Sequence, residues 1–203
     1  MAGAPGAAGQ VLGHPAVKPS RGFFTILGAA ALGLLAAGSA SASVLVLGEG
    51  LAPACSRAAF AGRSDRSSIE VCSRALAEGL SARDRAGTLV NRGVIRTRAK
   101  AYGPAARDFE EAIRLQPDLG EAFVNRGVLR MADRDYAGAL AEIDRGLALG
   151  VDEPAKAYYN RALAKEGVGD APGAWADYRQ AQALAPEWDA PAKMLVRFTV
   201  TPK

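Results

Sequence analysis

The chain repeats one pattern of apolar, small and polar positions three times between residues 89 and 186. Residues 89–96, 123–130 and 158–165 read LVNRGVIR, FVNRGVLR and YYNRALAK. In each copy the small residue at the fifth position is followed twelve residues later by a second small residue, then by a large apolar residue and a third small one. The copies start 34 and 35 residues apart, which predicts three consecutive helical hairpins.

The small positions indicate where the two helices of a hairpin approach each other closely. Larger side chains one turn away, such as Phe109 and Tyr178, fill the space beside this contact. Each hairpin leaves one apolar face open, and stacking on the next hairpin covers it. The small residues are Gly93, Gly127, Ala162, Ala105, Ala139 and Ala174.

This arrangement resembles the tetratricopeptide repeat, and within that family a bacterial exported type. The repeat combines a large apolar residue, a small residue four positions later, a later A-x3-F and a closing proline. The resemblance covers about residues 89–186 and implies an all-α solenoid with about three full repeats. The chain departs from the family where Arg96, Arg130 and Lys165 replace a frequent tyrosine, and where Val151 stands in place of the second closing proline.

Weaker signals extend the solenoid at both ends. Ser68, Cys72, Ala75 and Leu80 match the second helix of a repeat at identical spacing, which predicts a degenerate first repeat. An apolar helix from about Asp189 is expected to cap the last repeat, although a tail that docks on a partner is the alternative. The expected division is a signal peptide at 1–42, a linker at 43–50, a degenerate helix pair at 51–84, three repeats at 85–188, and a capping helix with a tail at 189–203.

The N-terminal region has the parts of a secretory signal. Lys18 and Arg21 form a basic flank, residues 23–37 are apolar, and Ala40-Ser41-Ala42 offers an A-x-A cleavage site. A leader of 42 residues is long, whereas one counted from Val17 has ordinary length, which suggests a misassigned start codon. We therefore expect a periplasmic or secreted domain.

An uncleaved membrane anchor is the alternative for this leader. The 27 residues between Arg21 and Glu49 carry no charge, which is enough chain to cross a bilayer. The basic flank stays in the cytoplasm in either case, so both interpretations place the repeats outside it.

Two charged columns of the repeat face each other between the helices of a unit in the resembling fold. The resemblance therefore implies three structural ion pairs, and a ligand-binding arginine ladder is the alternative. The columns hold Arg92, Arg126 and Arg161 on one side and Asp108, Glu142 and Asp177 on the other.

In the degenerate unit, Cys55 falls in the arginine column and Cys72 lies one residue beyond the acidic column. We expect a disulfide between them if the chain is exported, and a free buried thiol pair otherwise.

Composition leaves little room for catalysis. His14 is the single histidine and lies in the expected leader, and no glycine-rich phosphate loop occurs. No catalytic residue, metal site or cofactor is expected. A carboxylate pair such as Asp133 with Asp135 is the enzymatic rival, but aspartate is common in turns.

The charge balance argues against a nucleic-acid partner. The formal net charge is +4, and removal of a leader ending at Ala42 leaves 23 basic and 21 acidic residues. Charges of both signs are mixed along the helices, which is typical of a solvated surface. An RNA-binding helical repeat needs a basic groove, whereas this groove combines Glu121 with Lys156.

The first helix of each unit lines the concave groove in the resembling fold, and partners of such solenoids lie there. Asn91, Asn125 and Asn160 recur at one position, where they can hydrogen-bond an extended peptide backbone or satisfy internal polar groups. We therefore predict a non-enzymatic scaffold for a protein or peptide partner, with an envelope assembly or chaperone-like factor as the alternative. The predicted groove residues are Val90, Asn91, Val94, Arg98, Glu121, Val124, Asn125, Val128, Lys156, Tyr159, Asn160 and Leu163.

Some relatives clamp a chaperone's terminal carboxylate with lysines and asparagines in this groove. Asn125 and Lys156 match two of the clamp positions, whereas Val90, Val94 and Asn160 occupy the others. The basic clamp is therefore incomplete.

Overall fold

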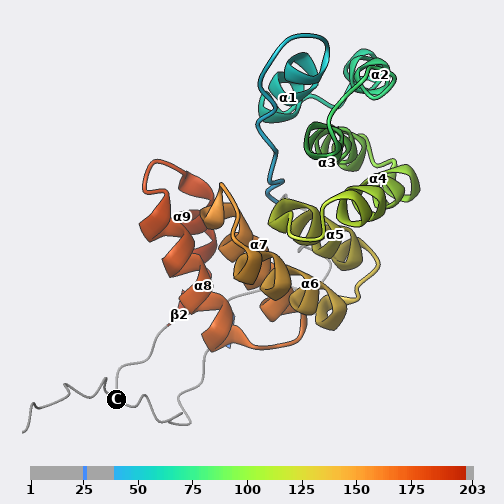
Figure 1. Cartoon of the computed structure of the whole chain (residues 1–203). Helices are drawn as coiled ribbons and strands as arrows, with labels where there is room; N and C mark the ends of the chain where they lie inside the picture. The colour runs from blue at the N-terminus through green and yellow to red at the C-terminus, as the bar shows by residue number, and fades with distance from the viewer. Residues whose placement is uncertain (1–24, 27–38, 200–203) are drawn as a thin grey trace, which may run out of the picture.

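The structure is a computed structural model that describes residues 25–26 and 39–199. Within these residues, helices stack in pairs into a curved all-α solenoid, as the sequence predicts (Figure 1). The helices are α1 (Ala52–Phe60), α2 (Arg66–Ala75), α3 (Ala82–Arg98), α4 (Tyr102–Leu115), α5 (Gly120–Ala132), α6 (Tyr136–Leu149), α7 (Pro154–Gly167), α8 (Ala171–Leu184) and α9 (Asp189–Leu195).

The small residues of the repeat lie where the two helices of a unit cross. A Cβ atom added at Gly127 of α5 would lie 2.8 Å from Cγ1 of Ile143 in α6 and 3.0 Å from the carbonyl oxygen of Ala139. Gly93 meets the ring of Phe109 in the same way in the preceding unit. Close helix contact therefore requires the small side chains that the repeat supplies.

The turn inside each unit repeats one backbone conformation. Lys100, Arg134 and Gly169 are 34 and 35 residues apart, and each has a positive φ, of 60°, 61° and 82°. Asp135 then caps α6 by accepting a hydrogen bond from the Gly138 N–H at 2.9 Å, and Asp170 does the same for α8. The 34-residue period is thus present in the turns as well as in the helices.

The predicted ion pairs form in all three units. Arg92 and Arg161 each bind the carboxylate of their partner through two nitrogens, and the shortest distance in each pair is 2.7 and 2.8 Å. Arg126 lies 2.8 Å from Glu142. These carboxylates are almost buried, so loss of one would leave a desolvated guanidinium without its partner.

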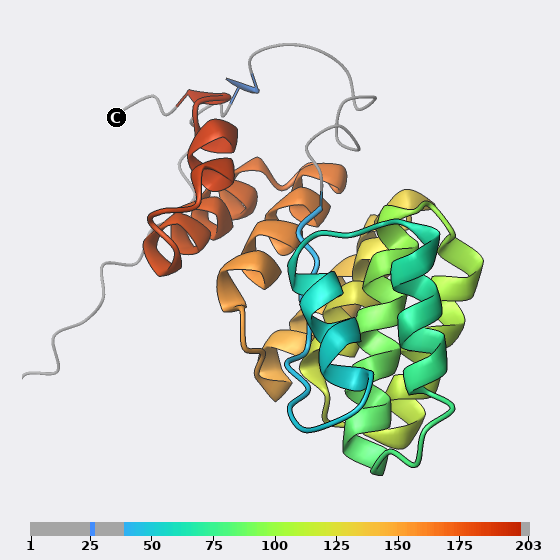
Figure 2. The same cartoon turned by 90° about the horizontal axis from the view of Figure 1, so that it is seen from above.

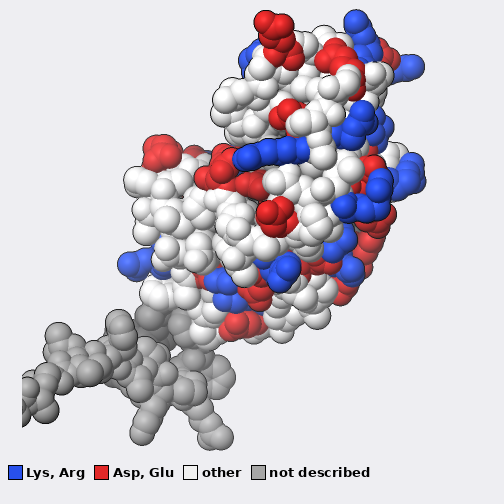
Figure 3. Space-filling model, viewed as in Figure 1, with Lys and Arg blue, Asp and Glu red and all other residues white. Residues whose placement is uncertain are grey.

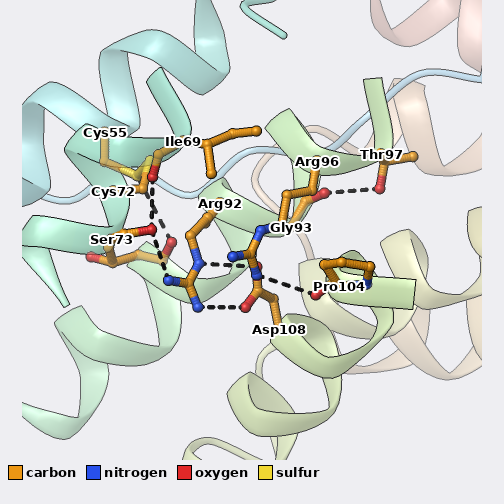
Figure 4. Close-up of polar contacts among 11 residues, drawn as sticks. Cys55, Ile69, Cys72, Ser73, Arg92, Gly93, Arg96, Thr97, Pro104 and Asp108 are labelled. Carbon is orange, nitrogen blue, oxygen red and sulfur yellow. Dashed lines mark hydrogen bonds and ion pairs between the residues drawn. A yellow bond between two sulfur atoms is a disulfide. The ribbon is translucent and has the colours of Figure 1, made fainter. Parts of the chain in front are cut away.

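The cations that replace the family's tyrosine serve the same carboxylates. Arg96 binds Asp108 at 2.7 Å beside Arg92 (Figure 4). Lys165 binds Asp177 at 2.9 Å beside Arg161. Arg92 also donates to Ser73 of the preceding unit at 3.0 Å. The charged network therefore joins neighbouring units as well as the two helices of one unit.

The first, degenerate unit is closed covalently. The Sγ atoms of Cys55 in α1 and Cys72 in α2 form a disulfide, as predicted (Figure 4). Both residues are fully buried and belong to a cluster of buried apolar residues that extends into α3 and α4. A covalent link between the two helices thus stands where the other units use an ion pair.

The C-terminal end of the solenoid is covered by α9 and the residues after it. Met194 and Phe198 are buried against the last repeat, and the Phe198 ring lies 6.0 Å from that of Tyr178. Phe198 and Thr199 form β2, which pairs antiparallel with β1 (Thr25–Ile26). Most of the expected leader lies outside the described residues, and among those described no helix is long and apolar enough to cross a bilayer.

We predict that the paired variant Cys55→Ser with Cys72→Ser will lose about 3 kcal/mol of unfolding free energy. The disulfide closes a loop of 17 residues, and the chain-entropy model gives this magnitude for such a loop. Urea denaturation under non-reducing conditions measures it, with dithiothreitol treatment of the unaltered chain as the matched control. Equal unfolding free energies for the double variant and the oxidised, unaltered chain would contradict the prediction.

Candidate functional site

The groove of the solenoid is occupied by the chain itself. Residues 39–47, here called the groove segment, run extended past the first helices of all units before leading into α1 (Figures 1 and 2). Ala42 is fully buried, and Ser43 and Val46 are nearly so. These residues include the expected cleavage site and most of the expected linker at 43–50, so the structure uses them as part of the domain.

The recurring asparagines hold the backbone of the groove segment. Each side-chain amide accepts the N–H of one segment residue and donates to the carbonyl oxygen of that same residue. The N–H to Oδ1 distances are 3.0, 3.2 and 2.9 Å, and the Nδ2 to carbonyl distances are 2.5, 2.7 and 2.7 Å. In that order, the pairs are Asn160 with Ala40, Asn125 with Ala42, and Asn91 with Val44.

The register of this ladder follows from two periods. Equivalent residues of the first helices are 34 or 35 positions apart, whereas an extended chain presents the same edge at every second residue. Each successive unit therefore binds every second residue of the segment. The segment runs antiparallel to the order of the units, since its first bound residue lies on the last unit. Ser56 of α1 continues the ladder, because its Oγ accepts the Val46 N–H at 3.3 Å and donates to the Val44 carbonyl at 2.9 Å.

The ladder asparagines are committed to this role. They are the only three asparagines in the chain, and their exposed fractions are 0–2%. Asn125 also donates to the Glu121 carbonyl of its own helix at 2.8 Å, which fixes the orientation of the amide. Because the contacts go to backbone atoms, they set the path of the bound strand and leave its side chains unspecified.

The groove segment packs closely at its C-terminal half. A Cβ atom added at Gly87 of α3 would lie 2.9 Å from Cγ1 of Val44 and 3.1 Å from Cγ2 of Val46. Gly87 stands at the position that Glu121 and Lys156 occupy in the following units. The absence of a side chain there lets the strand approach α3.

Beside the N-terminal part of the groove segment lies a cavity of about 260 Å³. Ser39 and Ser41 line it, whereas Ala40 and Ala42 do not, as expected for the alternating sides of an extended strand. Most of its other walls are apolar. They include Val128, Leu129, Met131, Tyr136 and Leu163, with Arg98 and Lys100 also lining it.

Some of the predicted groove residues lie at the groove, whereas others lie inside the units. Val94, Val128 and Leu163 share one repeat position and are buried, and the last two line the cavity beside the segment. Arg98 lines the same cavity and donates to the Ala59 carbonyl at 2.5 Å. Together with the asparagines, these residues lie at or near the groove.

Val90, Val124 and Tyr159, which share a second repeat position, face the interior of the units and not the groove. Val124 packs against Gly146 of α6, and the Tyr159 ring lies 5.4 Å from that of Tyr178 and 4.9 Å from that of Trp188. Val90, at the equivalent position, belongs to the buried cluster that contains Phe109. This column fills the interior of the units, because it lies on the side of each first helix that faces the second helix.

Two of the three charged residues predicted for the groove, Glu121 and Lys156, contact the loop before α7. Glu121 is buried and accepts the Asp152 N–H at 2.8 Å. Lys156 pairs with Glu153. Burial raises the pKa of Glu121, and the nearby Asp152 and Glu153 carboxylates act in the same direction.

Sequence reasoning missed the occupant and two residues that fit it. Neither the role of Ser56 nor that of Gly87 follows from the repeat pattern, because the first unit is degenerate and Gly87 varies between units. In the run ASASVLV at 40–46, alanine alternates with serine and β-branched Val44 and Val46 follow, which is the available signal for a strand. The same run also satisfies the pattern of a cleavage site.

Comparison with known proteins identifies the architecture. No family model matches the chain, and no curated protein is similar to it in sequence. Among solved structures, the Arabidopsis OM64 TPR domain superposes with a TM-score of 0.53 at 20% identity, covering 58% of this chain and 96% of that one. The chain has the tetratricopeptide-repeat fold.

Two further TPR structures are similar over comparable lengths. The first TPR of Spaghetti (RPAP3), bound to the HSP90 peptide SRMEEVD, has a TM-score of 0.52 at 20% identity and covers 57% of this chain and 90% of its own. MamA from Desulfovibrio magneticus has a TM-score of 0.54 at 20% identity and covers 71% and 79%. At these identities the likeness shows the fold alone.

We predict that Asn125→Asp will loosen the groove segment. The substitution keeps the size of the side chain but replaces the donor that faces the Ala42 carbonyl with a carboxylate oxygen. Loss of about 1 to 1.5 kcal/mol for this hydrogen bond corresponds to about tenfold faster amide exchange at Ala42 and Val44. Hydrogen exchange with mass spectrometry measures it, and Glu110→Gln on the exposed face of α4 is the matched control.

We predict that Glu121→Gln will stabilise the TPR domain increasingly as the pH rises. Because the pKa of Glu121 is raised in the folded state, the unaltered protein loses stability as this buried group ionises, whereas glutamine stays neutral and keeps an acceptor for the Asp152 N–H. Urea denaturation between pH 4 and pH 8 measures the difference. Asp118→Asn, at an exposed position nearby, is the control, and a difference independent of pH would contradict the prediction.

Proposed function

We propose that this chain is a non-enzymatic TPR scaffold that binds an extended stretch of another protein in its concave groove. The observation that carries the proposal is the asparagine ladder, which places six hydrogen bonds on three alternate residues of an extended backbone. Because the groove holds its own strand through main-chain atoms, it can bind an extended strand of another protein in the same place.

The chemistry of the groove supports binding over catalysis. The polar groups that hold the strand are three neutral amides and one hydroxyl, and their hydrogen bonds go to backbone atoms. In the part of the chain that the structure describes, no group of three or more His, Cys, Asp or Glu side chains could hold a metal ion. We therefore propose a role in recognition, without a bond-making or bond-breaking step.

The TPR neighbours support a peptide partner but suggest different selectivity. The first and second TPR domains of RPAP3 are described with the HSP90 peptide SRMEEVD and the HSP70 peptide SGPTIEEVD, which end in acidic residues. Here Lys156 is paired with Glu153, and Val90 and Val94 occupy clamp positions as buried residues. The groove of this chain therefore favours an uncharged strand over an acidic tail.

We further propose that the repeats lie outside the cytoplasm, in the periplasm or secreted. The leader pattern at 1–42 and the Cys55–Cys72 disulfide support this location, because structural disulfides persist in oxidising compartments. An envelope assembly or chaperone-like factor is the more specific form of the proposal. N-terminal sequencing of protein from its native cells tests it, and recovery of the chain from the cytoplasm with its leader intact and its cysteines reduced would refute it.

An RNA-binding helical repeat is less well supported. On the face of Figure 3, basic and acidic residues are interspersed, whereas RNA recognition by a groove needs a continuous basic lining. Lys156 is paired with Glu153, and the carboxylates of Asp152 and Glu153 act on that of Glu121.

The test uses the full-length chain with its own segment expelled. Ala42→Glu introduces a charge at a fully buried position of the groove segment, so the segment is expected to leave the groove while the helices stay folded. A labelled peptide with the sequence of residues 38–47 is then expected to bind, as measured by fluorescence anisotropy. Adding Asn125→Asp is expected to weaken binding about tenfold or more.

Ala42→Gly is the matched control, because it leaves the segment without a new charge. Circular dichroism establishes that each variant keeps its helical content. If the folded Ala42→Glu chain binds no peptide, the proposed function is wrong.

A further inference from the structure

The groove segment fits the groove well with its backbone and poorly with some of its side chains. Ala40, Ala42 and Val44 each make two hydrogen bonds to an asparagine, so the main chain is fully engaged along one edge. The hydroxyl of Ser43 is buried and has no hydrogen-bond partner among the described residues. Ser41 faces a cavity of about 260 Å³ that its small side chain leaves open.

We propose that residues 39–47 are a displaceable internal ligand, and that the partner is a peptide strand with a small residue at the Ala42 position and a large apolar residue at the Ser41 position. This inference rests on the proposed function and adds the chemical class of the partner. The internal strand shields the ladder until a strand with better side-chain complementarity replaces it.

The cavity determines the preference at the Ser41 position. Its walls include Val128, Leu129, Met131 and Leu163, which are apolar, and Tyr136 from α6. A leucine or phenylalanine side chain buries much more apolar surface there than serine does. Arg98 and Lys100 also line the cavity and disfavour a basic side chain at this position.

The Ala42 position requires a small side chain. Ala42 has no exposed surface, and neither Ala40 nor Ala42 borders the cavity. A large side chain at the Ala42 position has no open volume to enter and must push the strand away from Asn125, which breaks both hydrogen bonds of that rung. The groove thus distinguishes neighbouring positions of the strand by size.

Attachment to the same chain explains why a poorly fitting strand occupies the groove. The segment is joined to α1 by the short stretch 48–51, so its effective concentration at the groove is in the millimolar range. A partner therefore needs a better side-chain fit than the internal strand, and its apparent affinity for the unaltered chain falls by the fraction of time that the groove is open.

Three labelled peptides test this inference. The parent has the sequence of residues 38–47, and its Ser41→Phe and Ala42→Phe forms carry the same change at adjacent positions. In anisotropy titrations with the full-length Ala42→Glu chain, the Ser41→Phe peptide is expected to bind about 10- to 100-fold more tightly than the parent. The Ala42→Phe peptide is expected to bind at least about tenfold more weakly than the parent.

The unaltered chain and two further variants complete the experiment. The unaltered chain is expected to bind the Ser41→Phe peptide at least about tenfold more weakly than the Ala42→Glu chain does. Val128→Phe, which fills the cavity from the protein side, is expected to remove the advantage of the Ser41→Phe peptide and leave parent binding in place. Ala42→Pro, which deletes the N–H that Asn125 accepts, replaces Ala42→Glu if that chain loses its helical content.

The outcomes separate the two proposals. Equal binding of the two phenylalanine peptides would overturn the size rule while the scaffold function stands, and equal binding to the unaltered and Ala42→Glu chains would overturn the internal-ligand role. If the unaltered chain proves to be a dimer whose segments exchange, the occupant is a second copy and the inference is wrong. Failure of every peptide to bind a folded chain would instead remove the scaffold function itself.

Discussion

The match between one asparagine amide and the N–H and C=O groups of one extended residue determines how this solenoid handles a strand. A carboxamide offers one donor and one acceptor side by side, which is what an extended residue presents at its edge. Buried backbone groups need such partners, and helices whose own main-chain groups are paired can supply them only through side chains. Because equivalent residues of successive first helices face the groove, one asparagine per unit gives a ladder that follows the chain two residues at a time.

The repeat period made the helices and the ladder predictable, whereas the occupant was not. Small residues such as Gly127 and charged residues such as Arg92 recur every 34 or 35 positions, and both the helix crossings and the ion pairs follow from that recurrence. The pattern does not separate Val128, which lines the groove cavity, from Val124, which faces the second helix, because both positions are apolar and buried. Residues 40–46 lie outside the period, so the sequence pattern there predicts a cleavage site and a linker and assigns no place in the groove.

Because the groove segment overlaps the expected cleavage site, cleavage or retention of the leader determines how much of the groove is occupied. Cleavage after Ala42 would remove the strand residues that Asn125 and Asn160 hold, and would leave Val44 and Val46 on Asn91 and Ser56. Retention of the leader would keep all rungs of the ladder occupied by the chain itself. The two interpretations of the N-terminus therefore differ in how much of the groove is open, which makes processing part of the same physical question as partner binding.

Ion pairs hold the helices of the solenoid together, whereas hydrogen bonds and packing hold the strand in the groove. The arginine and carboxylate columns pair within and between units, so strong electrostatic interactions are used to hold the helices together. In the groove, neutral amides hold the strand, and the acceptor and donor pattern is the same at the three asparagine rungs. The cavity beside them has mostly apolar walls, with Arg98 and Lys100 also lining it. A recognition surface of this kind cannot distinguish strands by their backbones, since all extended backbones present the same groups. Selectivity must therefore come from the volumes beside the ladder, and the cavity at Ser41 is where the internal strand leaves such a volume unfilled.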